Sequence, residues 1–238
     1  MKNWITGSSI QIYRVLSGRS NVFYVRDDEV SLLVDSSVHF EWPMLEKKLT
    51  SNPLNIQRLD WLLLTHTHFD HAQNANRIKH RFHCPLIQHV SEAPLLQSGR
   101  NPPVLGANRF TRRITDLFNG QLPSLFNYPP ASADIWMLDN LPLYPIDYDI
   151  SIIHTPGHSP GSVSLIVDHE IAIVGDALFG VWPGSVFPPY ANDVQRLIQS
   201  WKVLLDTGCR LFLPSHGSER TREDLLGAYD HYSRLNLG

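Results

Sequence analysis

The chain has 238 residues, of which 42% are hydrophobic and 18% are charged, so it can bury a sizeable core. Its formal net charge of −3 at pH 7 argues against DNA or RNA as the main partner, because nucleic-acid-binding proteins usually carry a basic excess. The two cysteines, Cys84 and Cys209, lie too far apart in the sequence to suggest a disulfide framework.

The amino-terminal residues contain no continuous apolar run with a small-residue cleavage site, so the sequence does not predict a secretory signal. No stretch approaches the roughly 18 apolar residues of a membrane-spanning helix. We therefore expect a cytoplasmic protein with a small-molecule substrate and no membrane partner. A homodimer is compatible with this interpretation.

The first third of the chain alternates short runs rich in Ile, Val, Leu and Tyr with turn residues such as Gly18, which is typical of closely spaced strands. A proline at position 43 suits the first turn of a helix. We expect strands at residues 9–15, 21–26, 31–35, 59–64 and 85–90, and helices at 42–48 and 72–80.

Residues 92–130 are repeatedly interrupted by proline and glycine, with one helix expected at 109–118. A mixed segment between strands is typical of a surface excursion, which can act as a lid. After it we expect strands at 149–154, 162–168, 171–175 and 210–213, and helices at 192–206 and 220–232. Since no stretch has the composition of a linker, we expect residues 1–238 to form a single domain.

Four polar residues with metal-binding side chains, His66, His68, Asp70 and His71, directly follow the apolar run 59–64. At the end of a strand, residues i and i+2 share one face, so His66 and His68 should project together. Asp70 and His71 should follow on the next turn. Nitrogen and oxygen donors of this kind suit zinc, iron or manganese better than a thiolate site does.

Three later apolar runs are also followed within a few residues by histidine or aspartate. His158 follows residues 150–153, Asp176 follows 171–174, and His216 follows 211–213. If these strands lie in packed sheets, the side chains should gather at one edge, where loops fixed by rigid strands hold a site well.

In these residues the chain resembles the metallo-β-lactamase-fold superfamily. The resemblance rests on His66-x-His68-x-Asp70-His71, on TPGHSPGS around His158, on GDALF at Asp176 and on PSHG at His216, in the order found in the family. It extends over most of the chain. It implies an α/β fold, a four-layer αββα sandwich in which two mixed β-sheets carry helices on their outer faces.

The resemblance also implies two divalent metal ions, with Zn²⁺ expected and iron or manganese as alternatives. One ion would be held by His66, His68 and His158, the other by Asp70, His71 and His216, with Asp176 bridging them. Two such metals can share a water and lower its pKa to near 7, so that the bound hydroxide attacks a carbonyl or a phosphorus. Asp70 would also be catalytic, because it can orient that hydroxide or pass its proton onward.

Two kinds of residue remain open at this stage. Asp35, at the end of SLLVD, is either an acceptor for the N–H of a ligand histidine or a turn residue that ends a strand. In the aromatic and proline-rich segment 179–190, Trp182 and Tyr190 are candidate substrate contacts, and packing of the loop against the core is the alternative.

The expected activity is hydrolysis of a small carboxylic thioester, ester or lactone, because GDALF resembles the GDTLF of glyoxalase II-like members. The short segment after His216 argues against glutathione thioesters, since glyoxalase II carries a glutathione-binding helical segment there. The alternatives are a phosphodiesterase or nuclease of the same fold, a mononuclear iron enzyme resembling persulfide dioxygenases, and a non-catalytic sensor.

Overall fold

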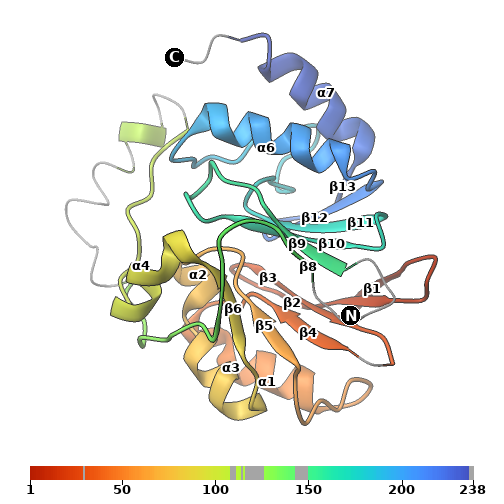
Figure 1. Cartoon of the computed structure of the whole chain (residues 1–238), viewed down its shortest axis with the longest axis vertical. Coiled ribbons are helices and arrows are strands. Elements are labelled where there is room, and N and C mark those ends of the chain that lie inside the picture. The colour runs from red at the N-terminus through yellow and green to blue at the C-terminus, as the bar shows by residue number, and fades with distance from the viewer. Residues whose placement is uncertain (29, 108–110, 114, 116–125, 143–149, 236–238) are drawn as a thin grey trace. The chain divides into compact units, whose positions relative to one another are not determined.

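The computed structural model describes residues 1–28, 30–107, 111–113, 115, 126–142 and 150–235 (Figure 1). They belong to two units, which are Met1–Pro102 with Phe126–Leu138, and Pro103–Leu125 with Asp139–Gly238. The single domain expected from the sequence stays a prediction. None of the helices in the described part of the chain has the length and hydropathy needed to cross a bilayer.

The first unit contains a seven-stranded mixed sheet in which the strands follow their order in the chain. Neighbours are antiparallel from β1 to β4 and parallel from β4 to β7. Because Val34 is paired with Leu63, β4 and β5 end at the same edge of the sheet. The strands are β1 (Lys2–Ile5), β2 (Gln11–Ser17), β3 (Asn21–Arg26), β4 (Ser31–Val34), β5 (Trp61–Leu63), β6 (Leu86–His89) and β7 (Ile135–Met137).

Helices α1 and α3 supply apolar side chains to the core of the first unit. Leu45 and Leu49 of α1 are fully buried, as are Ile78 and Phe82 of α3. These side chains join strand residues such as Leu62 in one hydrophobic cluster. The helical segments of this unit are η1 (His39–Glu41), α1 (Trp42–Thr50), α2 (Phe69–Ala72), α3 (Ala75–Phe82), η2 (Val90–Glu92) and α4 (Ala93–Ser98).

The second unit contains a six-stranded mixed sheet with the order β13-β12-β11-β10-β9-β8. Among the described strands of this sheet, β11 and β12 are parallel and the other neighbours are antiparallel. The elements are β8 (Leu141–Pro142), β9 (Ile150–His154), β10 (Val163–Val167), β11 (Ile171–Gly175), α6 (Val194–Asp206), β12 (Leu211–Pro214), β13 (Arg220–Thr221) and α7 (Arg222–Tyr232).

Helix α6 buries the apolar face that its sequence periodicity predicts. Leu197, Trp201 and Leu204 are fully buried in the core of the second unit, together with Phe212 of β12 and Leu225 of α7. Asp193 caps the helix by accepting from the backbone N–H of Arg196. The indole N–H of Trp201 donates to the carbonyl of Ala177 at 2.7 Å, so the helix also anchors the turn that follows β11.

The excursion expected at residues 92–130 is divided between the two units. Its ends, up to Pro102 and from Phe126 onward, belong to the first unit, and the part between them belongs to the second. The helix expected at 109–118 lies largely outside the described residues. The sequence did not predict α2, α4, β1, β7, β8 or β13, because runs of two to six residues carry too little periodicity to be recognised.

Candidate metal centre

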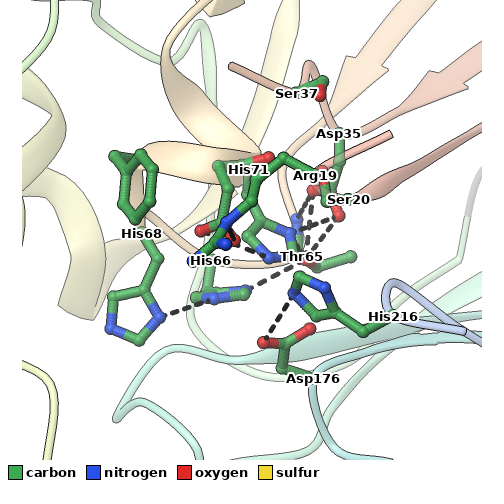
Figure 2. Close-up of polar contacts among 12 residues, drawn as sticks. Arg19, Ser20, Asp35, Ser37, Thr65, His66, His68, His71, Asp176 and His216 are labelled. Carbon is green, nitrogen blue, oxygen red and sulfur yellow. Dashed lines mark hydrogen bonds and ion pairs between the residues drawn. The ribbon is translucent and has the colours of Figure 1, made fainter. Parts of the chain in front are cut away.

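The first histidine pair lies just beyond β5, where the chain is extended before α2 begins. His66 and His68 are buried, and His66 Nε2 lies 2.9 Å from His68 Nδ1 (Figure 2). Their rings meet edge to face with centroids 4.6 Å apart. The two side chains therefore project together, as the spacing of two residues predicts for an extended chain.

Asp70 and His71 belong to the short helix α2 and not to a simple turn. The His71 ring lies with its centroid 4.0 Å from that of His66, and its Nε2 is 3.9 Å from Asp70 Oδ1. The first unit therefore gathers all four donors of the His66–His71 segment into one cluster. Three imidazoles and one carboxylate converge there.

Asp35 fulfils both interpretations offered by the sequence. It has a left-handed backbone with φ of 63° and ends β4, and its carboxylate lies 2.8 Å from His71 Nδ1. The same carboxylate accepts the backbone N–H of Thr65 at 2.8 Å. Because Nδ1 of His71 faces Asp35, Nε2 is the nitrogen of this ring that can face a metal.

In the second unit, Asp176 is the centre of a cluster with His158 and His216. Asp176 Oδ2 lies 3.5 Å from His158 Nε2 and 3.4 Å from His216 Nε2, the second of these contacts being drawn in Figure 2. The parallel strands β11 and β12 end side by side, and Ser215 N–H donates to the Gly175 carbonyl at 2.9 Å. This pairing brings Asp176 and His216 to the same sheet edge.

His158 is oriented by the segment that follows β11. Its Nδ1 lies 2.9 Å from the main-chain carbonyl of Tyr190, so Nε2 is the nitrogen directed at Asp176. The sequence had suggested Tyr190 as a substrate contact. The structure gives its carbonyl a different task, which is to hold a candidate metal ligand, while the role of the phenol side chain stays a prediction.

The donors of both clusters fit a borderline divalent metal, since they are imidazoles and carboxylates. Histidine and aspartate groups of this chain could hold metal ions. The two cysteines are free and buried, and burial raises the pKa of the Cys84 thiol to about 11, which keeps it protonated. Neither cluster includes a thiolate.

Comparison with known proteins gives the family. Residues 17–216 match the family model described as the metallo-beta-lactamase superfamily. The chain belongs to this superfamily. It is 28% identical over 183 residues to a probable metallo-hydrolase of Methanocaldococcus jannaschii, a match that covers 75% of this chain and 77% of the relative. It is 26% identical over 224 residues to the hydroxyacylglutathione hydrolase GloC of Haemophilus influenzae, covering 90% and 92%.

Solved structures confirm the predicted fold. An archaeal metallo-beta-lactamase superfamily protein from Sulfolobus tokodaii superimposes with a TM-score of 0.66 at 15% sequence identity, covering 94% of this chain and 87% of that chain. The two mixed sheets with their helices are thus the metallo-β-lactamase fold, in the α/β class.

Two aromatic residues that follow Asp176, Phe179 and Trp182, form a stack beside the candidate ligand His216. The Phe179 ring stacks on His216 with centroids 4.7 Å apart, and on Trp182 with centroids 6.3 Å apart. Trp182 is 49% exposed. Its role as a substrate contact stays a prediction.

Arg220 holds the segment that contains Trp182 and Ser185 by hydrogen bonds, although nothing in the sequence singled it out. Its guanidinium donates to the carbonyls of Trp182 at 2.8 Å and Ser185 at 3.2 Å, and to the Ser218 hydroxyl at 3.1 Å. Arg220 is 8% exposed, so one buried cation satisfies two carbonyl groups of the segment that follows Asp176.

Glu92 and Tyr128, which the sequence did not single out, both bind Thr67, the residue between His66 and His68. Thr67 points away from His66 and His68 because successive side chains of an extended chain alternate. Its hydroxyl donates to the fully buried Glu92 carboxylate, which also accepts the Thr67 N–H at 3.2 Å. The Tyr128 hydroxyl donates to the Thr67 carbonyl at 2.9 Å. Burial and the charge of Glu92 raise the pKa of Tyr128, so its phenol remains a donor.

Replacing Glu92 by alanine should lower the free energy of unfolding by about 1–3 kcal/mol, because two buried Thr67 donors lose their acceptor. It should also weaken metal binding by about 10- to 100-fold, since the residues that orient ligands control metal affinity. Denaturant titration and competition with a chelator measure the two effects. Glu46→Ala is the control, because Glu46 makes a partly exposed ion pair with Arg81. Equal metal affinity in both variants would contradict the role of Glu92 in holding the ligand segment.

Proposed function

We propose that the protein is a binuclear metal-dependent hydrolase that cleaves a small carboxylic thioester, ester or lactone. The observation that carries the proposal is the pair of ligand clusters in a superfamily member, one around His66 and the other around Asp176. We propose that they combine at one centre. His66, His68 and His158 would hold one ion, Asp70, His71 and His216 the other, and Asp176 would bridge them, with zinc as the expected metal.

When bound, such metals lower the pKa of a shared water and polarise the oxygen of the acyl group. The chain's own residues keep the donors in place. Asp35 holds the Nδ1 side of His71, and the Tyr190 carbonyl does the same for His158. The side chain of Asp70 is 10% exposed, so its carboxylate can touch both the buried cluster and solvent, where it can accept a proton.

The acyl substrate class is supported by the relative named hydroxyacylglutathione hydrolase, whose match covers nine-tenths of this chain. The acidic net charge disfavours a nucleic-acid substrate. We propose a cytoplasmic location, because two buried free cysteines suit a reducing compartment. A homodimer stays a prediction.

The test combines metal analysis with a substrate panel. We expect two zinc ions per chain by mass spectrometry. We also expect turnover of acyl thioesters, aryl esters or lactones that is lost with a strong chelator and regained on adding zinc. Preferred turnover of bis(p-nitrophenyl) phosphate would replace the proposal with a phosphodiesterase. One iron per chain, with oxygen consumption on a persulfide, would replace it with a dioxygenase.

A further inference from the structure

The turn between β2 and β3 makes hydrogen bonds to Glu41 and to Asp70, a member of the first ligand cluster. The backbone N–H of Arg19 donates to Glu41 Oε1 at 3.0 Å, and the Ser20 hydroxyl donates to the carbonyl of Asp70. A Cβ on Gly18 would lie 1.9 Å from Glu41 Oε1, so a larger residue there would displace the Glu41 side chain from its contact with the turn. The hydrogen bonds of Arg19 and Ser20 therefore hold the turn beside α2.

The side chain of Arg19 lies beside that of Asp70 and is the more exposed of the two. Its Nε is 3.8 Å from Asp70 Oδ2, and the Arg19 side chain is 61% exposed whereas that of Asp70 is 10% exposed. The guanidinium carbon also lies 5.8 Å from the centre of the Phe69 ring. A guanidinium has five N–H donors, and one loose contact to Asp70 leaves most of them able to meet a ligand.

Stability gives little reason for this arrangement, because exposed ion pairs contribute only about 0–1 kcal/mol. Electrostatics gives a better one. When Asp70 and Asp176 serve as ligands, their charges, that of the bound hydroxide and that of Asp35 beside His71 balance two divalent cations, so the centre would be close to neutral. The exposed Arg19 then supplies positive charge at its edge, and the nearby Glu41 is directed at the backbone of the turn. Such a site attracts anions.

We propose that Arg19 binds an anionic group of the substrate, so that the hydrolase prefers acyl compounds that carry a carboxylate close to the scissile bond. The planar fork of arginine matches the two oxygens of a carboxylate. This inference rests on the proposed hydrolase function and names the substrate class within it. Arg19 would thus determine specificity without taking part in the chemical step.

The experiment compares two pairs of thioesters that differ in charge. The first pair is S-acetyl-3-mercaptopropionate and its neutral amide. The second is the S-succinyl thioester of a neutral thiol and the same thioester with its free carboxylate converted to a methyl ester. In at least one pair we expect kcat/KM for the anion to exceed that for the neutral partner by about tenfold, the effect of one charge-assisted hydrogen bond. Arg19→Gln should bring this ratio close to one. High salt should do so in part, because it screens an exposed charge.

Binding supplies a readout that does not depend on turnover. Ketone analogues with CH₂ in place of the thioester sulfur should show the same charge preference in their Kd by calorimetry, and Arg19→Gln should remove it at unchanged metal content. Arg58→Gln is the matched control, since Arg58 is exposed and precedes β5, whereas the ligands follow that strand. Its charge preference should equal that of the wild type.

The outcomes separate the two proposals. If the metal-loaded wild type turned over none of the thioesters, esters and lactones, the hydrolase function itself would be overturned. Good turnover with no charge preference in either pair would overturn the role of Arg19 alone. A preference that Arg19→Gln and Arg58→Gln reduce equally would also overturn it, because it would then reflect only the net charge of the protein.

Discussion

Asp176→Asn is expected to lower kcat/KM by at least about a thousandfold, equivalent to roughly 4 kcal/mol of transition-state stabilisation, and to reduce the bound metal. The carboxylate is the shared neighbour of His158 and His216, with 3.5 Å and 3.4 Å to their Nε2 atoms. An amide keeps the shape of the side chain but removes the negative charge that a bridge between two cations needs. Metal content per chain and steady-state kinetics measure both effects.

The control for Asp176→Asn is Asp206→Asn, the same substitution at an exposed position of the second unit. Asp206 pairs with Lys202 along α6, and such helix pairs contribute only about 0.3–0.5 kcal/mol. This variant should keep both metal and activity. If Asp176→Asn retained two metal ions per chain and full turnover, Asp176 would not be the bridging ligand.

The sequence predicted those parts of the site that depend on strand ends. An apolar run that stops at a polar residue marks where a buried strand leaves the sheet, and this signal located Asp176 after β11 and His216 after β12. The spacing of two residues correctly predicted that His66 and His68 point the same way. These inferences are local, since they need only the alternation of side chains along an extended chain.

The residues that hold the donors in place could not be predicted in the same way. Glu92 lies 25 positions from Thr67, and Tyr128 lies 61 positions away, so no periodicity connects them. Arg220 resembles any charged residue at the start of a helix until its contacts to two distant carbonyls are known. Burial of a polar side chain depends on tertiary packing, and only the folded structure shows which partners satisfy it.

Asp35 falls between these cases. The pattern SLLVD located it at the end of β4, but the sequence left a turn residue and a histidine partner equally open. The register of β4 with β5 decides the matter, because pairing of Val34 with Leu63 brings Asp35 beside the start of the ligand segment. A parallel pairing between strands that are nearly thirty residues apart is not visible in either strand alone.

Asp70→Ala should lower kcat by about a thousandfold or more while the protein stays folded, because it removes a group that both ligates metal and can accept a proton. The fold should tolerate the change. The Asp70 side chain is 10% exposed, and α2 is also held through its main chain, since the carbonyls of Asp70 and His71 accept the Ser20 and Ser36 hydroxyls. Thermal unfolding should therefore shift only slightly in the metal-free protein.

Asp70→Asn separates the two tasks of this carboxylate. The amide oxygen can still approach a metal, but the group no longer carries a charge and cannot accept a proton. We therefore expect Asp70→Asn to retain more metal than Asp70→Ala while losing kcat to a similar extent. If both variants lost metal equally and recovered activity together at high zinc concentration, Asp70 would act as a ligand only. A fully active Asp70→Ala variant would remove Asp70 from the catalytic centre altogether, and with it the reason for Arg19 to lie where it does.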